Sequence, residues 1–132
     1  MQDELLMKIR VKCEEPVSVA GKNRKIVMIP FTGEAEGDLF SGHVIGTGVD
    51  TQKIDGENKA FLSARYMLEG QDAAGNACRV FVENQGFWGE SFTPSIVTDS
   101  PLLAGWENAN LYATADGIQE GVLISIFRKG EE

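Results

Sequence analysis

Hydrophobic and polar residues alternate along most of the chain with a period of two, which is the period of a β-strand rather than a helix. The clearest case lies near the N-terminus, where residues 7–13 read MKIRVKC. Such an alternation is typical of a strand with one buried face and one exposed face. Because the same period recurs in segment after segment, the sequence predicts an all-β protein.

The alternating segments are separated by turn sequences and define about eight short strands. They cover approximately residues 7–13, 16–20, 25–31, 39–52, 60–69, 77–84, 110–115 and 122–128. Asp55-Gly56 is a good hairpin signal, residues 85–94 read as a loop, and residues 101–109 fit one or two helical turns. We therefore expect a single domain over residues 1–132, folded as an antiparallel β-barrel with little helix.

The long segment 39–52 carries glycines at positions 42, 46 and 48 and an aspartate at position 50. Residues of equal parity share a face of a strand, so Asp50 lies on the face of the three glycines. Glycines at alternate positions either let the strand bend at a barrel corner or leave an open cavity. The sequence leaves both explanations open.

Closing the two hairpins that follow brings three polar residues onto this face. Asp50 comes near Leu62 or Ala64, and a glycine of the preceding segment falls opposite Tyr66. The second hairpin then places Tyr66 near Val82 and Ala64 near Asn84. Asp50, Tyr66 and Asn84 are therefore predicted to share an interior face that is otherwise apolar.

The opposite, odd-numbered face carries Arg65, Arg79 and Glu83, so we expect it to point outward, with an ion pair between Arg65 and Glu83. Apolar residues lie on this face as well, and a monomer seldom exposes so many of them. We expect a second subunit or the terminal strands to cover them, and a homo-oligomer is favoured. The apolar residues in question are Leu39, Ile45, Val49, Phe61, Met67 and Phe81.

Composition narrows the list of partners. The 132 residues are 42% hydrophobic and 24% charged, with a net charge of −8 and one short basic cluster, GKNRK at residues 21–25. Nucleic acids and anionic membranes attract basic surfaces, so neither is an expected partner. No apolar run is long enough for a signal peptide or a membrane span, which favours a cytoplasmic location. Cys13 and Cys78 are expected to be free, buried thiols.

Asp50 and Tyr66 are the candidate catalytic residues. Burial raises the pKa of a carboxyl group, which suits it to act as a general acid or base near neutral pH. Tyr66 can donate a hydrogen bond to a developing oxyanion, assisted by Asn84 as a substrate-binding residue. In the structural alternative, Asp50 caps backbone amides at the strand bend and Tyr66 is a core aromatic residue.

Three further residues are candidate substrate-binding residues. Arg65 would reach the cavity and clamp a carboxylate if a β-bulge turned it inward. Phe87 and Trp88 lie in a loop that also contains Phe92, and such aromatic residues form either a lid over a ligand or a plug in the barrel end. No metal site is expected, because His43 is the only histidine and the two cysteines lack ligand spacing.

Several segments resemble the DUF3237 family, also called UPF0311. They are GTGVDTQ (46–52), ARYMLEGQDAAG (64–75), VENQG (82–86), TPSIVTDSPLLAGW (93–106) and GVLISIFRK near the C-terminus. The resemblance implies a small antiparallel β-barrel without an established activity. Asp50, Arg65, Tyr66, Asn84 and Gly86 match recurrent family positions. This chain departs from the family at Thr51-Gln52, where an aromatic residue is common, and at residues 72–75, where a shorter DG turn is usual.

Three classes of function fit these expectations. The first is a cofactor-independent isomerase, cyclase or lyase that acts on an apolar or aromatic small molecule with a carbonyl or carboxylate. The second is a carrier or sensor that holds such a molecule without reacting with it. The third is a structural or interaction module whose lumen is filled by side chains. An open cavity at Asp50 separates the first two classes from the third.

Overall fold

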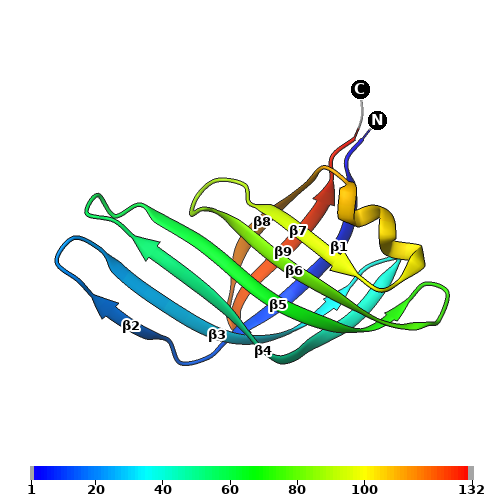
Figure 1. Cartoon of the computed structure of the whole chain (residues 1–132), viewed down its shortest axis with the longest axis horizontal. Coiled ribbons are helices and arrows are strands. Elements are labelled where there is room, and N and C mark those ends of the chain that lie inside the picture. Colours follow the sequence, from blue (N-terminus) through cyan, green and yellow to red (C-terminus); the bar gives the residue numbers. More distant parts are fainter. Residues whose placement is uncertain (1, 131–132) are drawn as a thin grey trace.

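Nine antiparallel strands form one strongly curled sheet (Figure 1), seen here in a computed structural model that describes residues 2–130. The strands are β1 (Glu4–Cys13), β2 (Val17–Ala20), β3 (Lys25–Glu36), β4 (Phe40–Ile54), β5 (Ala60–Asp72), β6 (Ala77–Phe87), β7 (Thr93–Thr98), β8 (Leu111–Ile118) and β9 (Gly121–Arg128). The helical segment among the described residues is a 3₁₀ helix, η1 (Pro101–Asn108). The prediction of an all-β fold is confirmed.

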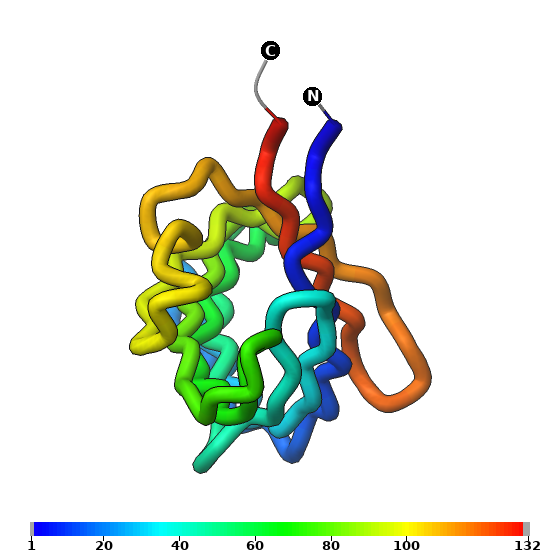
Figure 2. The backbone as a smooth tube through the Cα atoms, turned by 90° about the vertical axis from the view of Figure 1, so that its right-hand side faces the viewer, coloured from blue at the N-terminus to red at the C-terminus, as the bar shows by residue number. Residues whose placement is uncertain are grey.

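The sheet runs in the order β7-β6-β5-β4-β3-β1-β9-β8, and β2 pairs with β3 beyond the end of β1. Its two outermost strands curl toward each other, and Figure 2 shows the backbone of the strands arranged in a ring. Phe92, just before β7, and Ala113 in β8 exchange two backbone hydrogen bonds of 2.9 and 2.8 Å. The result is a half-barrel, and its two edge strands, β7 and β8, approach each other at this single bridge.

Alternate side chains point into the curled sheet and form its core. Leu68, Val80, Val82 and Ile126 are fully buried, and η1 adds Leu103 and Trp106. Each predicted strand is present, and most are longer than predicted. The prediction of a loop over residues 85–94 was wrong at both ends, where residues 85–87 belong to β6 and residues 93–94 begin the unpredicted strand β7. Pro94 is tolerated there since β7 pairs with a single full strand, β6.

The predicted register between β4, β5 and β6 is confirmed. Asp50 pairs with Ala64, which pairs with Asn84, and Tyr66 pairs with Val82. A bulge interrupts β4 between Ile45 and Val49, where residues 46–48 lie opposite Tyr66 alone. Because the bulge adds two residues, it preserves parity, and the residues on either side of it keep the same inward face.

The glycines of β4 have different roles, and neither strand bending nor an open cavity, the two explanations offered by the sequence, accounts for them fully. Gly46 lies in the bulge with φ +63°, a conformation that side-chain-bearing residues rarely adopt. A Cβ atom on Gly48 would lie 2.5 Å from the ring of Phe31 and 2.9 Å from Cβ of Tyr66. Gly48 therefore makes room for Phe31, whose ring packs edge-on against Tyr66 with a centroid separation of 5.4 Å.

The outer face follows the parity prediction. Arg65 and Glu83 form an ion pair of 2.6 Å there, and Ile45, Met67 and Phe81 are half-buried on the same face. Both cysteines are unpaired, but the prediction of two buried thiols was wrong for Cys13, which is exposed at the end of β1. Among residues 2–130, no helix is long and apolar enough to cross a membrane.

Candidate functional site

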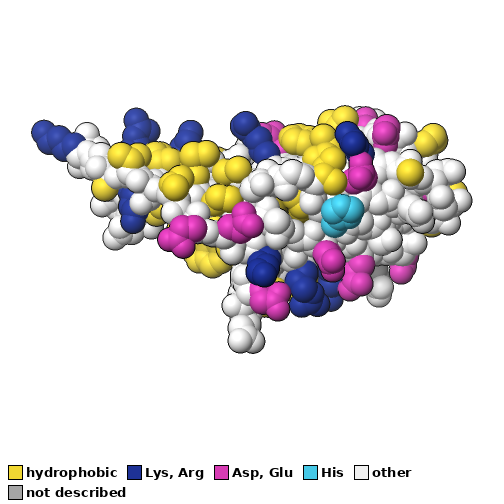
Figure 3. Space-filling view, turned by 90° about the horizontal axis from the view of Figure 1, so that it is seen from below, with side chains coloured by type: hydrophobic (Ala, Val, Ile, Leu, Met, Phe, Trp, Pro, Cys, Tyr) yellow, Lys and Arg dark blue, Asp and Glu magenta, His cyan; other side chains and the backbone are white. Residues whose placement is uncertain are grey.

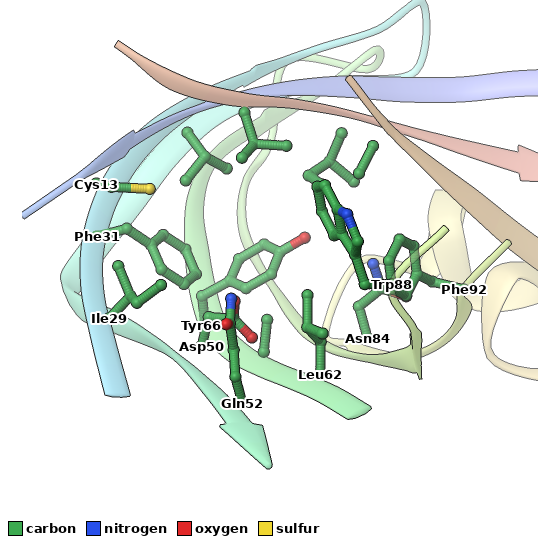
Figure 4. A pocket seen from close by; sticks show the side chains of 15 residues that line it. Cys13, Ile29, Phe31, Asp50, Gln52, Leu62, Tyr66, Asn84, Trp88 and Phe92 are labelled. Atoms are coloured by element: carbon green, nitrogen blue, oxygen red, sulfur yellow. The ribbon is translucent and has the colours of Figure 1, made fainter. Parts of the chain in front are cut away.

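A cavity of about 180 Å³ lies inside the curled sheet, on the face that carries Asp50. Side chains from β1, β3, β4, β5, β6, β8 and β9 and from the β6–β7 loop line it (Figure 4). Its walls are mainly apolar, formed by Val11, Ile29, Phe31, Leu62, Ala64, Phe92, Ala115, Val122 and Ile124. Its polar lining comes from Asp50, Gln52, Tyr66 and Asn84, together with Cys13 and Trp88, and no described Lys, Arg or His is among the lining residues.

Three buried polar atoms in this cavity have no hydrogen-bond partner within residues 2–130: Oδ1 of Asp50, the hydroxyl of Tyr66 and Oδ1 of Asn84. The three residues come from neighbouring strands, β4, β5 and β6, as the sequence predicted. Buried polar groups in folded proteins are nearly always paired, because an unpaired one costs desolvation free energy. Three such atoms around one cavity therefore indicate a place prepared for a polar ligand or for water.

Asp50 is held by one side-chain contact, since its Oδ2 accepts a 3.0 Å hydrogen bond from Nε2 of Gln52. Burial raises the pKa of Asp50, and the Gln52 hydrogen bond offsets part of this rise. No hydrogen bond joins the Asp50 carboxylate to a backbone amide among the described residues. The structural alternative, in which Asp50 caps the strand bend, is therefore not supported.

Asp72 shows what a structural carboxylate looks like in the same fold. Its Oδ1 accepts hydrogen bonds from the backbone amides of Ala74 and Asn76, at 3.0 and 3.1 Å. Its Oδ2 accepts a 2.7 Å hydrogen bond from the hydroxyl of Ser100. These bonds, led by that of Ser100, lower the pKa of Asp72. Asp50 has neither this set of donors nor this direction of pKa shift, so a purely structural role does not explain it.

Tyr66 reaches into the middle of the cavity. Figure 4 shows its hydroxyl between a side lined by Cys13, Ile29 and Phe31 and a side lined by Trp88 and Phe92. Burial raises the pKa of Tyr66 far above its usual value, so the side chain stays a neutral hydrogen-bond donor. Asp50 and Tyr66 do not hydrogen-bond to each other, so both side chains are free to bond to a ligand in the cavity that they line.

The aromatic residues of the β6–β7 segment were predicted to form a lid or a core plug, and Phe92, Trp88 and Phe87 each take a different position. Phe92 is buried and packs on Gly86, where a Cβ atom would lie 2.6 Å from its ring, so it plugs the core. Trp88 lines the cavity while 59% exposed, as a lid residue would be. Phe87 is not in the cavity, because it pairs with Phe61 on the outer face at a centroid distance of 5.1 Å. Adjacent strand residues point to opposite faces, which explains this correction.

Arg65 also lies outside the cavity. The bulge that would have turned it inward exists in β4, but its two extra residues leave the parity of the neighbouring strand unchanged. Arg65 is 67% exposed and paired with Glu83. The alternative in which Arg65 clamps a carboxylate in the lumen is therefore wrong for this structure.

Two polar lining residues were not nominated from the sequence. Gln52 holds Asp50, and its equal parity two residues later was the available signal. Cys13, although exposed as a whole residue, borders the cavity from β1, where partial burial of its thiol and the charge of Asp50 raise the thiol pKa. Nothing in the local sequence indicates that β1 pairs with β3 and so brings Cys13 close to Asp50 on β4. No group of three potential metal ligands occurs within residues 2–130.

Comparison with known proteins gives one family and one fold. Residues 2–101 match the family described as "Protein of unknown function (DUF3237)". A UPF0311 protein of Clostridium acetobutylicum is 29% identical over 91 residues, which cover 65% of this chain. The match spans 54% of the length of that relative.

Several solved structures share the fold. A protein of unknown function from Clostridium acetobutylicum superposes with a TM-score of 0.84 at 22% identity, covering 98% of this chain and 97% of that one. A β-barrel-like protein from Acinetobacter baumannii gives 0.83 at 19% identity, with coverages of 98% and 96%. An enzyme from Penicillium herquei gives 0.80 at 14% identity, with coverages of 98% and 94%.

Proposed function

The chain belongs to the DUF3237 family, and we propose that its cavity binds a small, neutral, largely apolar molecule that carries a carbonyl group. We further propose that Asp50 and Tyr66 transfer a proton at the carbon next to this carbonyl. The reaction class is a cofactor-independent isomerisation, cyclisation or elimination. The three unpartnered polar atoms of Asp50, Tyr66 and Asn84 carry this proposal.

Each of the three atoms can bond to a different group of the ligand. The Tyr66 hydroxyl needs an acceptor, which a carbonyl oxygen provides, and its hydrogen bond strengthens as charge develops on that oxygen. Oδ1 of Asp50 accepts a proton from the adjacent carbon or hydroxyl, and its raised pKa makes it a stronger base than an exposed carboxylate. Oδ1 of Asn84 accepts from a hydroxyl or N–H group of the ligand.

Size and charge narrow the ligand. The cavity volume of about 180 Å³ is close to the roughly 150 Å³ of an engineered apolar cavity that binds benzene, so one ring with a short substituent fits. A carboxylate ligand would meet Asp50 without a described cation in the cavity to offset the repulsion. A neutral carbonyl compound is therefore favoured over the carboxylate alternative. That a Penicillium herquei protein of the same fold is an enzyme agrees with a catalytic use of this architecture.

A matched pair of probes tests the proposal. Phenylacetone and phenylacetate have similar shapes, but the first is neutral and the second is charged. We expect phenylacetone to shift the backbone NMR signals of the cavity residues, and phenylacetate to bind at least about tenfold more weakly. Absence of any phenylacetone-induced shift at the cavity, at millimolar concentration, would contradict ligand binding of this class.

The same probe separates catalysis from carriage. In D₂O, a general base in the cavity exchanges the protons next to the ketone for deuterium, which ¹H NMR follows directly. We expect the wild-type protein to accelerate this exchange and Asp50→Asn to lose the acceleration while still binding the ketone. Binding without accelerated exchange would leave a carrier or sensor as the function.

A further inference from the structure

Strand β2 is a free edge of the sheet. It pairs with β3 on one side, and all four of its residues are exposed. Figure 1 shows it along the margin of an arm formed by the ends of β3, β4 and β5 and the turns between them, and none of the nine described strands lies on its outer side. An exposed edge strand presents unpaired backbone groups that can pair with another strand.

The register identifies which backbone groups are free. Gly21 donates a 2.8 Å hydrogen bond to the carbonyl of Arg24, which continues the pairing of β2 with β3. Hydrogen-bonded and non-hydrogen-bonded pairs alternate in an antiparallel ladder. Val17 and Val19 therefore bond to β3, whereas the N–H and C=O groups of Ser18 and Ala20 point away from the sheet.

The side chains of β2 are exposed and mostly hydrophobic, which favours association of this edge with another strand. Val17 and Val19 are 62% and 63% exposed, and they lie on the outer face beside Met28, which is 42% exposed. Natural edge strands are usually protected by charged or proline residues along their length, but β2 itself contains none. Figure 3 shows hydrophobic side chains gathered along this arm.

Charge along this segment is divided between its two ends. Glu14 and Glu15 precede β2, and Lys22, Arg24 and Lys25 follow it. All five side chains are exposed, and none takes part in an ion pair of the described structure. A second copy that runs antiparallel places its basic end against the acidic end of the first copy, at both ends of the strand. A parallel copy would place like charges together.

We propose that two copies of this chain associate through β2, paired antiparallel across a two-fold axis close to Ser18. The interface is isologous, because each copy offers the same strand and the same two charged ends. With Ser18 on the axis, Val17 of one copy lies opposite Val19 of the other on the outer face, and Glu14 lies opposite Lys22. Ser18 pairs with its counterpart through its free N–H and C=O groups, and the two curled sheets become one continuous sheet.

Charge-reversed variants give a test that does not depend on the ligand. E14K/E15K makes both ends of β2 basic, and K22E/R24E makes both ends acidic. Each variant alone should raise the dimer dissociation constant at least about tenfold, as measured by sedimentation equilibrium. An equimolar mixture of the two should form heterodimers, because opposite charges then meet at both ends of the strand. This recovery also shows that the variants are folded.

A proline pair tests the backbone contacts. Ser18→Pro removes an N–H group that points away from β3, so it should keep the monomer fold and abolish dimerisation. Val19→Pro removes an N–H group bonded to β3 and should disrupt the hairpin itself. A wild-type chain that is monomeric at all concentrations contradicts the proposal. So does a dimer that survives both charge reversals and Ser18→Pro, since this would place the interface elsewhere, such as on the outer face of β4–β6.

Discussion

At the residue scale, Gly48 shows how a missing side chain shapes the cavity wall. A methyl group there would lie 2.5 Å from the ring of Phe31 and 2.9 Å from Cβ of Tyr66. Gly48→Ala should therefore displace this aromatic pair and destabilise the protein by about 1–3 kcal/mol. Gly105→Ala is the matched control, because apart from its chain neighbours and the backbone of its own helix no described residue lies within 4 Å of the added carbon. Chemical denaturation measures both variants, and equal stabilities would contradict this packing account.

The hydroxyl of Tyr66 provides a second residue-scale prediction. It is buried without a partner, so Tyr66→Phe removes an uncompensated polar group and should change stability by less than about 1 kcal/mol, with a gain expected. The same change should weaken binding of phenylacetone about tenfold, because the carbonyl oxygen loses its donor. NMR titration of both proteins tests this. A large loss of stability with unchanged binding would make the hydroxyl structural.

At the element scale, the bulge in β4 decides which residues face the cavity. It places three residues opposite Tyr66, and the two extra residues preserve the inward face. Deleting Gly46 and Thr47 together should therefore keep Asp50 inside, whereas deleting Thr47 alone should turn the remainder of β4 over. We expect the single deletion to lower the melting temperature more than the double deletion. The reverse order would show that the bulge has another purpose.

The strands, the register of β4, β5 and β6 and the assignment of their two faces could be predicted from the sequence. The period of two gave the strands, and the hairpin turns gave the register that joins Asp50 to Ala64 and Tyr66 to Val82. Charge then assigned the two faces, as the Arg65–Glu83 ion pair confirms. These features depend on residues close in sequence or joined by short turns, for which local patterns are informative.

The rest depends on contacts between distant segments. The position of Cys13 at the cavity follows from the pairing of β1 with β3 and β9, which no local pattern reveals. Phe87 and Trp88 are adjacent but face opposite sides, and only the exact end of β6 decides which one lines the cavity. The space at Gly48 is filled by Phe31, its direct partner on β3, a pairing that the sequence did not predict because it ended this strand at residue 31.

At the scale of the whole molecule, Asp50 links the cavity to the pH dependence of folding. Its pKa is raised in the folded state, so the folded protein binds this proton more tightly than the unfolded chain does. Stability is therefore lost as pH rises from the unfolded pKa toward the folded one. Asp50→Asn removes this loss, and its stability advantage over the wild type should grow through that interval and then level off.

Denaturant unfolding of both proteins between about pH 3 and 8 measures this difference. Asp72 provides the opposite control, because its lowered pKa contributes stability that is present above the unfolded pKa and lost as pH falls. Asp72→Asn should therefore be less stable than the wild type, and this deficit should grow over the acidic range as pH rises. An advantage of Asp50→Asn that did not depend on pH would contradict the burial of an ionisable, poorly compensated carboxyl group.

The central claim is that the cavity keeps a buried carboxylate without the donors that a structural role would supply. The ¹³C NMR titration of the Asp50 carboxyl carbon in the free protein tests it most directly. The account predicts a midpoint clearly above the model-peptide value of about 3.9, because burial outweighs the single hydrogen bond from Gln52. A midpoint at or below that value would show that backbone amides or cations stabilise the charged form, and would remove Asp50 as the base of the proposed reaction.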